Sequence, residues 1–299
     1  GGCPFQAGAA QGFVSVPARI RAQEEQGKVR AKPEKFADHY TQARLFFESQ
    51  TPVEKDHIAN AFRFELSKVT LPAIRERMVS SLRNASEELA QKVAMGLGID
   101  PLPEPMPLAL PDLVVEPEVL KSPALSLLAR PGDGSIKGRK VALLVAAGAD
   151  GDLIAKVQAA LVEQGAVARL VGPRIGPFKA GNGDVMDADA SLENEPGFLF
   201  DALVLPDGKE AVAALAQDGH SLEFVKDQFR HCKTILAFGA SQALLLKAGL
   251  PVSMDKSLAQ GGTGLILADA ADAQTAVETF IAAMGKHRHF GREMDPSML

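Results

Sequence analysis

The turn Gly239-Ala240-Ser241 is the first candidate for chemistry, because it follows an apolar run at 234–238 and precedes helical sequence. A tight turn between a strand and a helix lifts its central side chain into the cleft, forming a nucleophile elbow when that side chain is reactive. Here the elbow position is Gly239, which has no side chain. Ser241 lies two residues further on, and no His follows a neighbouring strand to activate it. We therefore assign Ser241 a capping or packing role.

Cys232 and the adjacent His231 look like a thiol–imidazole pair. Both precede the strand at 234–238, so we expect them at the opposite end of the sheet from any cleft. Adjacency in sequence does not make a catalytic pair, and we interpret Cys232 as a structural cysteine. The chain has two cysteines, too few for a disulfide framework, which fits a reducing cytoplasm.

Two other patterns suggest metal and phosphate binding, and both are incomplete. His287 and His289 lie near the end of the last predicted helix, where residues two apart point away from each other. We expect helix-dipole and surface roles for them rather than shared metal ligation. The glycine run at 261–264 precedes a strand and lacks the Lys-Ser/Thr ending of a phosphate loop. We predict no catalytic, cofactor-binding or metal-binding residue in this chain.

The elements that position these residues fall into two blocks. In the second block, residues 139–299, short apolar runs alternate with helical sequence, which predicts a parallel sheet covered by helices on both faces. The predicted strands lie at 141–146, 167–171, 201–206, 234–238 and 265–268, with a helix at about 150–164 and a hairpin tip at 181–184. The fold class is α/β, with a helical segment followed by a flavodoxin-like parallel-sheet domain.

The first block has three parts. Residues 1–37 mix Gly, Pro and charges and are expected to form an extended arm. Residues 38–100 are expected to form four short helices. A start signal at Thr51-Pro52-Val53-Glu54 precedes a helix with one apolar stripe, and Ile74, Met78 and Leu82 after Pro72 indicate the next helix. Eight prolines between 101 and 138 favour an extended linker between the two blocks.

Composition excludes several classes of protein. The chain has 299 residues, of which 46% are hydrophobic and 23% charged, and no apolar stretch approaches the ~18 residues of a membrane helix. The net charge is −5, and neither half has the surplus of Lys and Arg that nucleic-acid binding needs. The chain shows no signal peptide and opens on Gly-Gly-Cys-Pro without an initiator Met. We interpret it as the middle of a longer polypeptide or a processed product.

Four segments resemble one known family. They are GGCPFQAGAA at the start, DHYTQARLFFESQTPVEKDHIANAFRFELSKV at 38–69, IRERMVSSLRN at 74–84 and the terminal HRHFGRE. They are similar to the tail of the large-subunit monofunctional haem catalases, the hydroperoxidase II group, and the resemblance covers essentially all 299 residues in order. It implies the C-terminal part of a cytoplasmic homotetramer that disproportionates hydrogen peroxide to water and oxygen in the response to oxidative stress. The implied partners are the upstream haem core and the other subunits.

The resemblance carries over no catalytic residue. The family needs a distal His and Asn above the haem, and a proximal Tyr on a helix that bears an Arg one turn before it. None of these motifs is present, and the only tyrosine, Tyr40, lacks that Arg. Haem is therefore expected in the intact parent enzyme and not in this chain alone. We expect the fragment to be inactive by itself and to serve stability and oligomer assembly.

The second domain resembles the class I glutamine-amidotransferase fold, which includes stress chaperones, deglycases and intracellular proteases. Those relatives place a Cys at the elbow and an acidic residue just after the first strand, where this chain has Gly239 and Leu153. The alternative function is a free-standing chaperone-like or binding module of this superfamily. An independent cysteine hydrolase is the weakest hypothesis because the nucleophile is missing. The mass of the native polypeptide separates the first two hypotheses.

Overall fold

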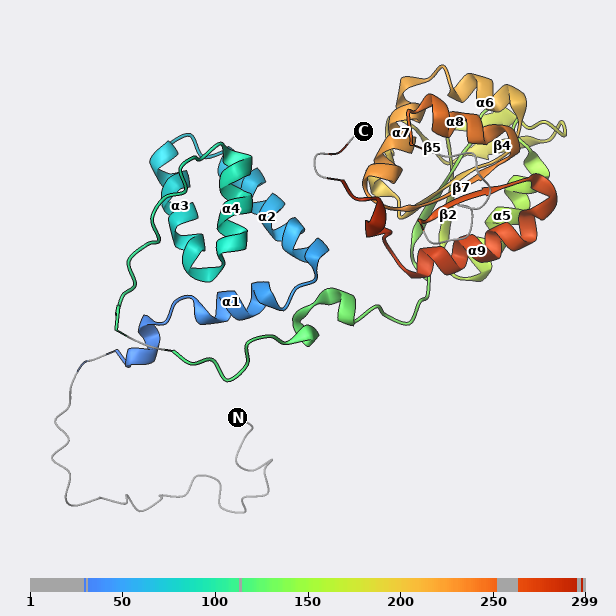
Figure 1. Ribbon diagram of the computed structural model, residues 1–299. Coiled ribbons are helices and arrows are strands. Elements are labelled where there is room, and N and C mark those ends of the chain that lie inside the picture. Colours follow the sequence, from blue (N-terminus) through green and yellow to red (C-terminus); the bar gives the residue numbers. More distant parts are fainter. Residues whose placement is uncertain (1–29, 31, 113–114, 252–262, 295–296, 298–299) are drawn as a thin grey trace, which may run out of the picture. The chain divides into compact units, whose positions relative to one another are not determined.

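The computed structural model describes residues 30, 32–112, 115–251, 263–294 and 297. Most of the expected arm at 1–37 lies outside the described residues. The chain divides into two compact units, one formed by 65–120 with the residues up to 45, the other by 46–64 with 121–299. Figure 1 shows the first helices in blue and the α/β domain in green to red.

The helical segment contains four helices, as the sequence predicts: α1 (Thr41–Glu48), α2 (Pro52–Ser67), α3 (Pro72–Ala85) and α4 (Glu87–Leu97). One residue, Ser86, joins α3 to α4. Its extended backbone ends α3, and its hydroxyl caps α4 by accepting the Leu89 amide at 3.4 Å. Because the connection is this short, α3 and α4 pack against each other.

The helix predicted from Ile74, Met78 and Leu82 is present as α3. Its buried residues, Val79, Leu82 and Ala85, lie in the second half of the helix. Nearer the start of α3, Ile74 and Met78 are each 39% exposed, and Leu71, which precedes the helix, is 61% exposed. These three side chains form the exposed apolar face of α3.

The first part of the linker lies along α3. Ser80 donates to the Glu104 carbonyl oxygen at 2.6 Å and Asn84 to that of Met106 at 2.7 Å. A proline-rich segment has few amide donors of its own, so side chains of the helix satisfy its carbonyl groups.

The second part of the linker is held by the helix-start signal of α2. Glu54 accepts hydrogen bonds from the Thr51 amide and from the Leu127 amide, each at 2.9 Å, and from the Ser126 hydroxyl at 2.8 Å. Partial burial raises the pKa of Glu54, but these bonds outweigh it and lower the pKa to about 2. The carboxylate thus closes a capping box and also binds the linker.

The α/β domain is built on a six-stranded sheet with the order β5-β2-β1-β6-β7-β8, in which all pairs are parallel. The order of the five longer strands is that of flavodoxin-like folds. Their bounds are β1 (Lys140–Leu144), β2 (Val167–Gly172), β5 (Ala190–Ser191), β6 (Ala202–Leu205), β7 (Thr234–Phe238) and β8 (Leu265–Ala268). The α/β fold class is confirmed, and among the strands of the described residues only the two-residue β5 was not predicted from the sequence.

Helices cover both faces of the sheet. In Figure 1, α5 (Gly151–Glu163) and α9 (Ala273–Gly285) lie together on one face, with α6 (Lys209–Leu215), α7 (Gly219–Arg230) and α8 (Gln242–Lys247) on the other. The predicted hairpin is also present, as β3 (Gly176–Lys179) paired antiparallel with β4 (Val185–Ala188).

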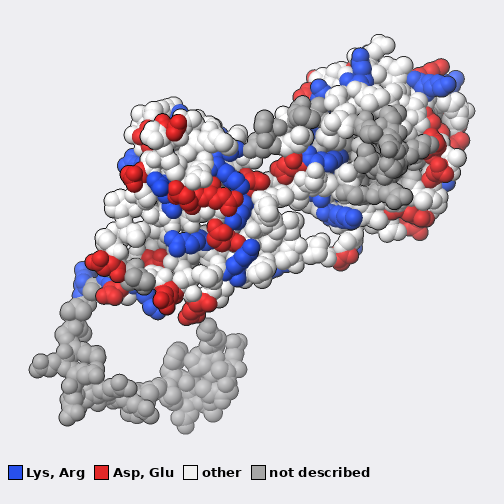
Figure 2. All heavy atoms as spheres, viewed as in Figure 1, with Lys and Arg blue, Asp and Glu red and all other residues white. Residues whose placement is uncertain are grey.

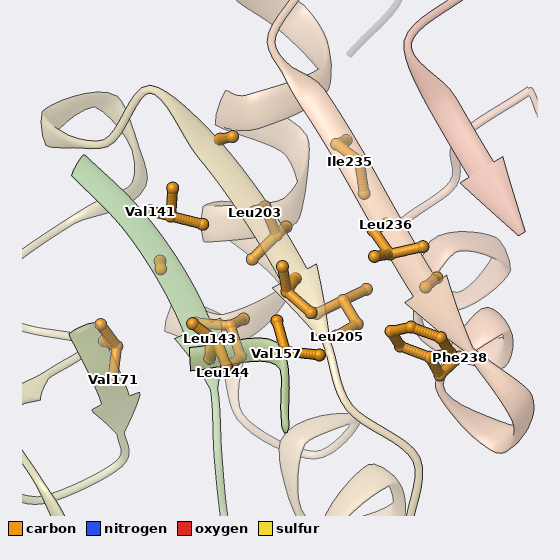
Figure 3. Close-up of a cluster of buried hydrophobic side chains, with 14 of the residues drawn as sticks. Val141, Leu143, Leu144, Val157, Val171, Leu203, Leu205, Ile235, Leu236 and Phe238 are labelled. Carbon is orange, nitrogen blue, oxygen red and sulfur yellow. The ribbon is translucent and has the colours of Figure 1, made fainter. Parts of the chain in front are cut away.

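The core of the domain is the sheet itself. Strands β1, β6 and β7 bury nearly every residue, which a parallel sheet covered on both faces requires. Figure 3 shows Leu143, Leu203 and Leu236 among the side chains of this core. All three are fully buried.

Outside the core, acidic and basic side chains mix on the face that Figure 2 shows, over both parts of the chain. None of the described helices is long and apolar enough to cross a membrane.

Candidate functional site

The carboxyl ends of β1, β6 and β7 meet at one edge of the sheet, where open parallel sheets bind ligands. The turns that follow these strands contain Gly148–Asp150, Asp207-Gly208 and Gly239–Ser241. The Asp150 amide donates to the Asp207 carbonyl oxygen at 2.8 Å. The Ala240 amide donates to the Asp207 carboxylate at 2.9 Å. The three turns therefore converge at this edge of the sheet.

Gly239 has the left-handed backbone of an elbow, with φ +48°. The Asp207 carboxylate fills the place that a side chain would take. A Cβ on Gly239 would lie 2.8 Å from Asp207 Oδ1 and still closer to Cγ and Oδ2, far inside van der Waals contact. The chain therefore keeps the turn but places an internal carboxylate where a nucleophile elbow would carry its reactive side chain. Asp207 is not among the candidate residues that the sequence alone suggests.

Two more glycines make this edge tight. Gly148 has φ +84°, and a Cβ there would lie 2.7 Å from the Cβ of Glu210. Gly208 has φ +134°, and its Cβ would lie 2.8 Å from the Cα of Ala149 and collide with the Gly148 carbonyl oxygen. Both positions combine a backbone that side chains rarely adopt with a neighbour too close for a Cβ.

Ser241 and Leu153, the two other positions considered for nucleophilic catalysis, serve packing. Ser241 is 1% exposed, and its hydroxyl lies 2.7 Å from the carbonyl oxygens of both Leu205 and Phe238. It makes no helix-cap hydrogen bond, so the packing alternative is the correct one. Leu153, at the position of the acidic residue, is 5% exposed and belongs to the core.

Cys232 lies at the opposite edge of the sheet, as predicted, and is 3% exposed. Burial raises the pKa of its thiol, although the positive charge of Arg292 opposes the change. Burial also lowers the pKa of His231. A thiol that resists ionisation is a poor nucleophile, so the structure supports the structural role.

The expectation of a surface role for His289 is wrong. Helix α9 ends at Gly285, so His289 is not helical, and it is 6% exposed with Nε2 3.0 Å from the Thr234 hydroxyl. Burial, followed by the positive charges of Arg292 and Lys286, lowers its pKa to about 4. His287 is exposed. Of the glycine run, 261 and 262 lie outside the described residues, and a Cβ on Gly264 would collide with the His289 ring.

The geometry defines a class of protein: a flavodoxin-like domain with an occupied elbow, preceded by a helical segment and a linker bound to it. Two family models match the chain. One, described as catalase-related immune-responsive, matches residues 33–97, and the other, the C-terminal domain found in long catalases, matches residues 137–294.

Individual relatives agree with the family models. Catalase C of Rhizobium meliloti is 42% identical over 284 residues, which are 95% of this chain and 38% of that protein. Catalase HPII of Pseudomonas putida is 39% identical over 98% of this chain and 38% of its own length. Catalase HPII of Mycobacterium avium is 35% identical over 99% of this chain and 40% of its own length. The chain belongs to the long catalases and spans about two fifths of the length of these relatives.

Catalases are haem enzymes, and the described residues do not fit the iron. Haem ligation by tyrosinate needs a buried phenolate stabilised by positive charge. Tyr40 is only partly buried, its hydroxyl lies 3.4 Å from the Ser81 hydroxyl, and Phe36 and Ala37 stand one turn before it instead of Arg. Within the described part of the chain, no group of three or more His, Cys, Asp or Glu is arranged to hold a metal ion.

Proposed function

We infer that this chain is the non-haem C-terminal part of a catalase that disproportionates hydrogen peroxide, and that it serves the stability and assembly of the haem-bearing oligomer. The observation that carries the proposal is the match of both family models, in order, over a chain that covers only 38–40% of its relatives. The catalytic segment would lie in the part of the polypeptide that precedes residue 1.

The exposed face of α3 supports a docking role. Leu71, Ile74 and Met78 are 61%, 39% and 39% exposed, and apolar side chains grouped on one face of a helix mark a contact with another protein surface. The rest of the catalase polypeptide is the occupant that this proposal requires.

The mass of the native polypeptide is the first test. The 284 matched residues make up 38% of the Rhizobium relative, so a complete protein is expected to be about 2.5 times as long as this chain. A native polypeptide of 299 residues would overturn the proposal in favour of a free-standing chaperone-like or binding module of the glutamine-amidotransferase-like superfamily.

Hemin titration is the second test. We expect the isolated chain to show neither a stoichiometric Soret band nor oxygen release from peroxide, because it lacks an iron ligand and a distal acid–base group. Tyr40→Phe is the matched control, and its titration should be the same as that of the parent sequence. A band that depends on Tyr40 and is accompanied by turnover would contradict the inference.

The assembly role is tested in the complete polypeptide. Ile74→Asp places a charge on the exposed apolar face of α3, and we expect it to weaken the oligomer in light scattering. Gln91→Asp adds the same charge at an exposed polar position of α4 and should leave the oligomer intact. Equal oligomer masses for the two variants would rule out docking through α3.

A further inference from the structure

The elbow of this domain holds a carboxylate. Asp207 Oδ1 accepts the Ala240 amide at 2.9 Å and the Gly208 amide at 2.7 Å. The first donor belongs to the residue after the elbow, which in nucleophile elbows contributes an amide to the developing oxyanion. The Asp207 carboxylate therefore makes, within the chain, the hydrogen bond that a reacting anion would make.

The bond also ties two strands together. Asp207 follows β6 and Ala240 follows β7, and the two strands are neighbours whose ends are in register, with Leu205 opposite Ala237. A hydrogen bond from an amide to a carboxylate is stronger than one between neutral groups. It is placed where both ladders stop and the backbone groups need new partners.

The same carboxylate explains the glycine at the elbow. Any Cβ at 239 would overlap the Asp207 carboxyl group, and the +48° φ adds backbone strain for a side chain. The next residue, Gly208, is also tightly packed, because a Cβ there would collide with the Gly148 carbonyl oxygen. Position 207 and position 239 thus depend on each other.

We propose that Asp207 is a built-in ligand of the elbow, which occupies the anion position and requires glycine at residue 239. The carboxylate replaces a substrate-derived anion, holds the ends of β6 and β7 together and excludes external carboxylates from the turn. This role is independent of the assembly function proposed above.

A double-mutant cycle tests the contact. Gly239→Ala, Asp207→Ala and the double variant are compared with the parent chain by urea unfolding and by hydrogen exchange of peptides covering 202–215 and 234–247. Removal of the carboxyl group removes the overlap with the methyl group introduced at position 239. Each variant lowers the folding equilibrium constant by some factor. We expect the factor for the double variant to be at least about tenfold smaller than the product of the factors for the two single variants.

The matched control is Asp187→Ala, an exposed carboxylate of β4. Combined with Gly239→Ala, it should give additive effects. An Asp207–Gly239 cycle as additive as this control would overturn the proposal.

A second measurement applies if Gly239→Ala does not fold. Asp207→Ala leaves the Ala240 amide without its acceptor, so sodium formate, a free carboxylate, should slow hydrogen exchange in the 234–247 peptide. Sodium chloride at equal ionic strength should not, and the parent chain should respond to neither salt. Equal exchange of Asp207→Ala in formate and in chloride would refute an anion position at the elbow.

Discussion

The α/β domain and the helical segment differ in the size of their cores. In the domain the large side chains Phe200, Phe224, Phe238 and Phe280 are all nearly fully buried. In the helical segment α3 and α4 share a small core of Val, Leu and Ala side chains, and Leu71 and Met95 are 61% and 74% exposed. Exposed apolar residues also occur on the domain, for example Phe198 at 57%, so the difference lies in the extent of the buried core.

This difference shows that similar amphipathic patterns can accompany cores of very different size. A parallel sheet covered by helices is complete within one domain, and burial of its strands needs nothing outside it. Two short helices joined by one residue bury only one face each. We therefore expect the domain to unfold cooperatively and the helical segment to depend on contacts outside this chain.

The largest expected effect comes from a pair of alanine substitutions, one in each region. Leu236→Ala, at a fully buried position of β7, should cost about 2–5 kcal/mol through lost burial and a cavity. Ile74→Ala on the exposed face of α3 should cost about 0.5 kcal/mol or less in the isolated chain. Urea unfolding followed by hydrogen exchange measures each unit separately. A cost at Ile74 equal to that at Leu236 would break the comparison.

His289 provides a second test, because the α/β domain buries this ionisable ring and its stability should therefore depend on pH. Its pKa of about 4 lies below the ordinary 6.5, so the unfolded chain binds the proton first as the pH falls. The free energy of unfolding that the neutral His289 ring contributes above pH 6.5 should therefore be lost as the pH falls toward 4. This loss is at most about 3 kcal/mol. Beside burial, the charges that oppose protonation come from Arg292, Lys286 and Arg288.

The measurement is the pH dependence of unfolding for the parent chain and for His289→Gln, an uncharged side chain that can still bond Thr234. Burial also lowers the pKa of His231 and His287, so the difference between the two proteins, and not the total slope, reports on His289. Parallel curves between pH 7 and pH 4 would contradict a buried neutral ring.

The linker between the two regions provides a smaller effect. Glu54→Gln weakens the acceptor of Thr51, Ser126 and Leu127, so proteases should cut within 121–138 severalfold faster. Because the pKa of Glu54 is lowered, the parent chain should lose the same protection only as the pH falls from about 4.5 through about 2.

Glu65→Gln is the control for this experiment, since Glu65 is an exposed carboxylate that pairs with Lys68 on the surface. Limited proteolysis with mass spectrometry should yield a resistant fragment near 139–299 for all three proteins. Identical cleavage rates for Glu54→Gln and Glu65→Gln would show that the Glu54 hydrogen bonds do not protect the linker.

The smallest expected effect is on thiol reactivity. Gly239→Cys should destabilise the domain by overlap with Asp207, without creating a reactive thiolate, because Leu153 provides no acidic partner and Asp207 adds negative charge nearby. The measurement is the rate of iodoacetamide labelling of the new cysteine as a function of pH. Cys232, which is buried, is the internal reference. Rapid labelling of the new thiol at pH 6 would show a cleft still organised for thiol chemistry.

Sequence analysis predicted the elements of the domain because strands buried on both faces are continuous apolar runs, as at Thr234–Phe238. It also located the elbow, since Gly239 follows such a run directly. It did not predict the burial of His289, because α9 ends at Gly285 and the chain then turns back to Thr234 of β7, a tertiary contact without a local pattern.

On α3, helical periodicity predicts the helix but not how deeply each apolar side chain is buried: Val79 is fully buried, whereas Met78 is 39% exposed. At the elbow, the type of residue 207 is compatible with an ordinary turn. Its role depends on an amide 33 positions later in the chain, which spacing alone does not reveal.

The mutual dependence of residues 207 and 239 limits how this domain can change over time. A side chain at 239 overlaps the carboxylate, and loss of the carboxylate first leaves two turn amides without their acceptor. Either single step to a nucleophilic elbow therefore passes through a less stable protein, and an acid at 153 would have to replace a core leucine. Each single substitution is therefore expected to lower the stability of the domain, and the occupied elbow is expected to change only when both residues change together.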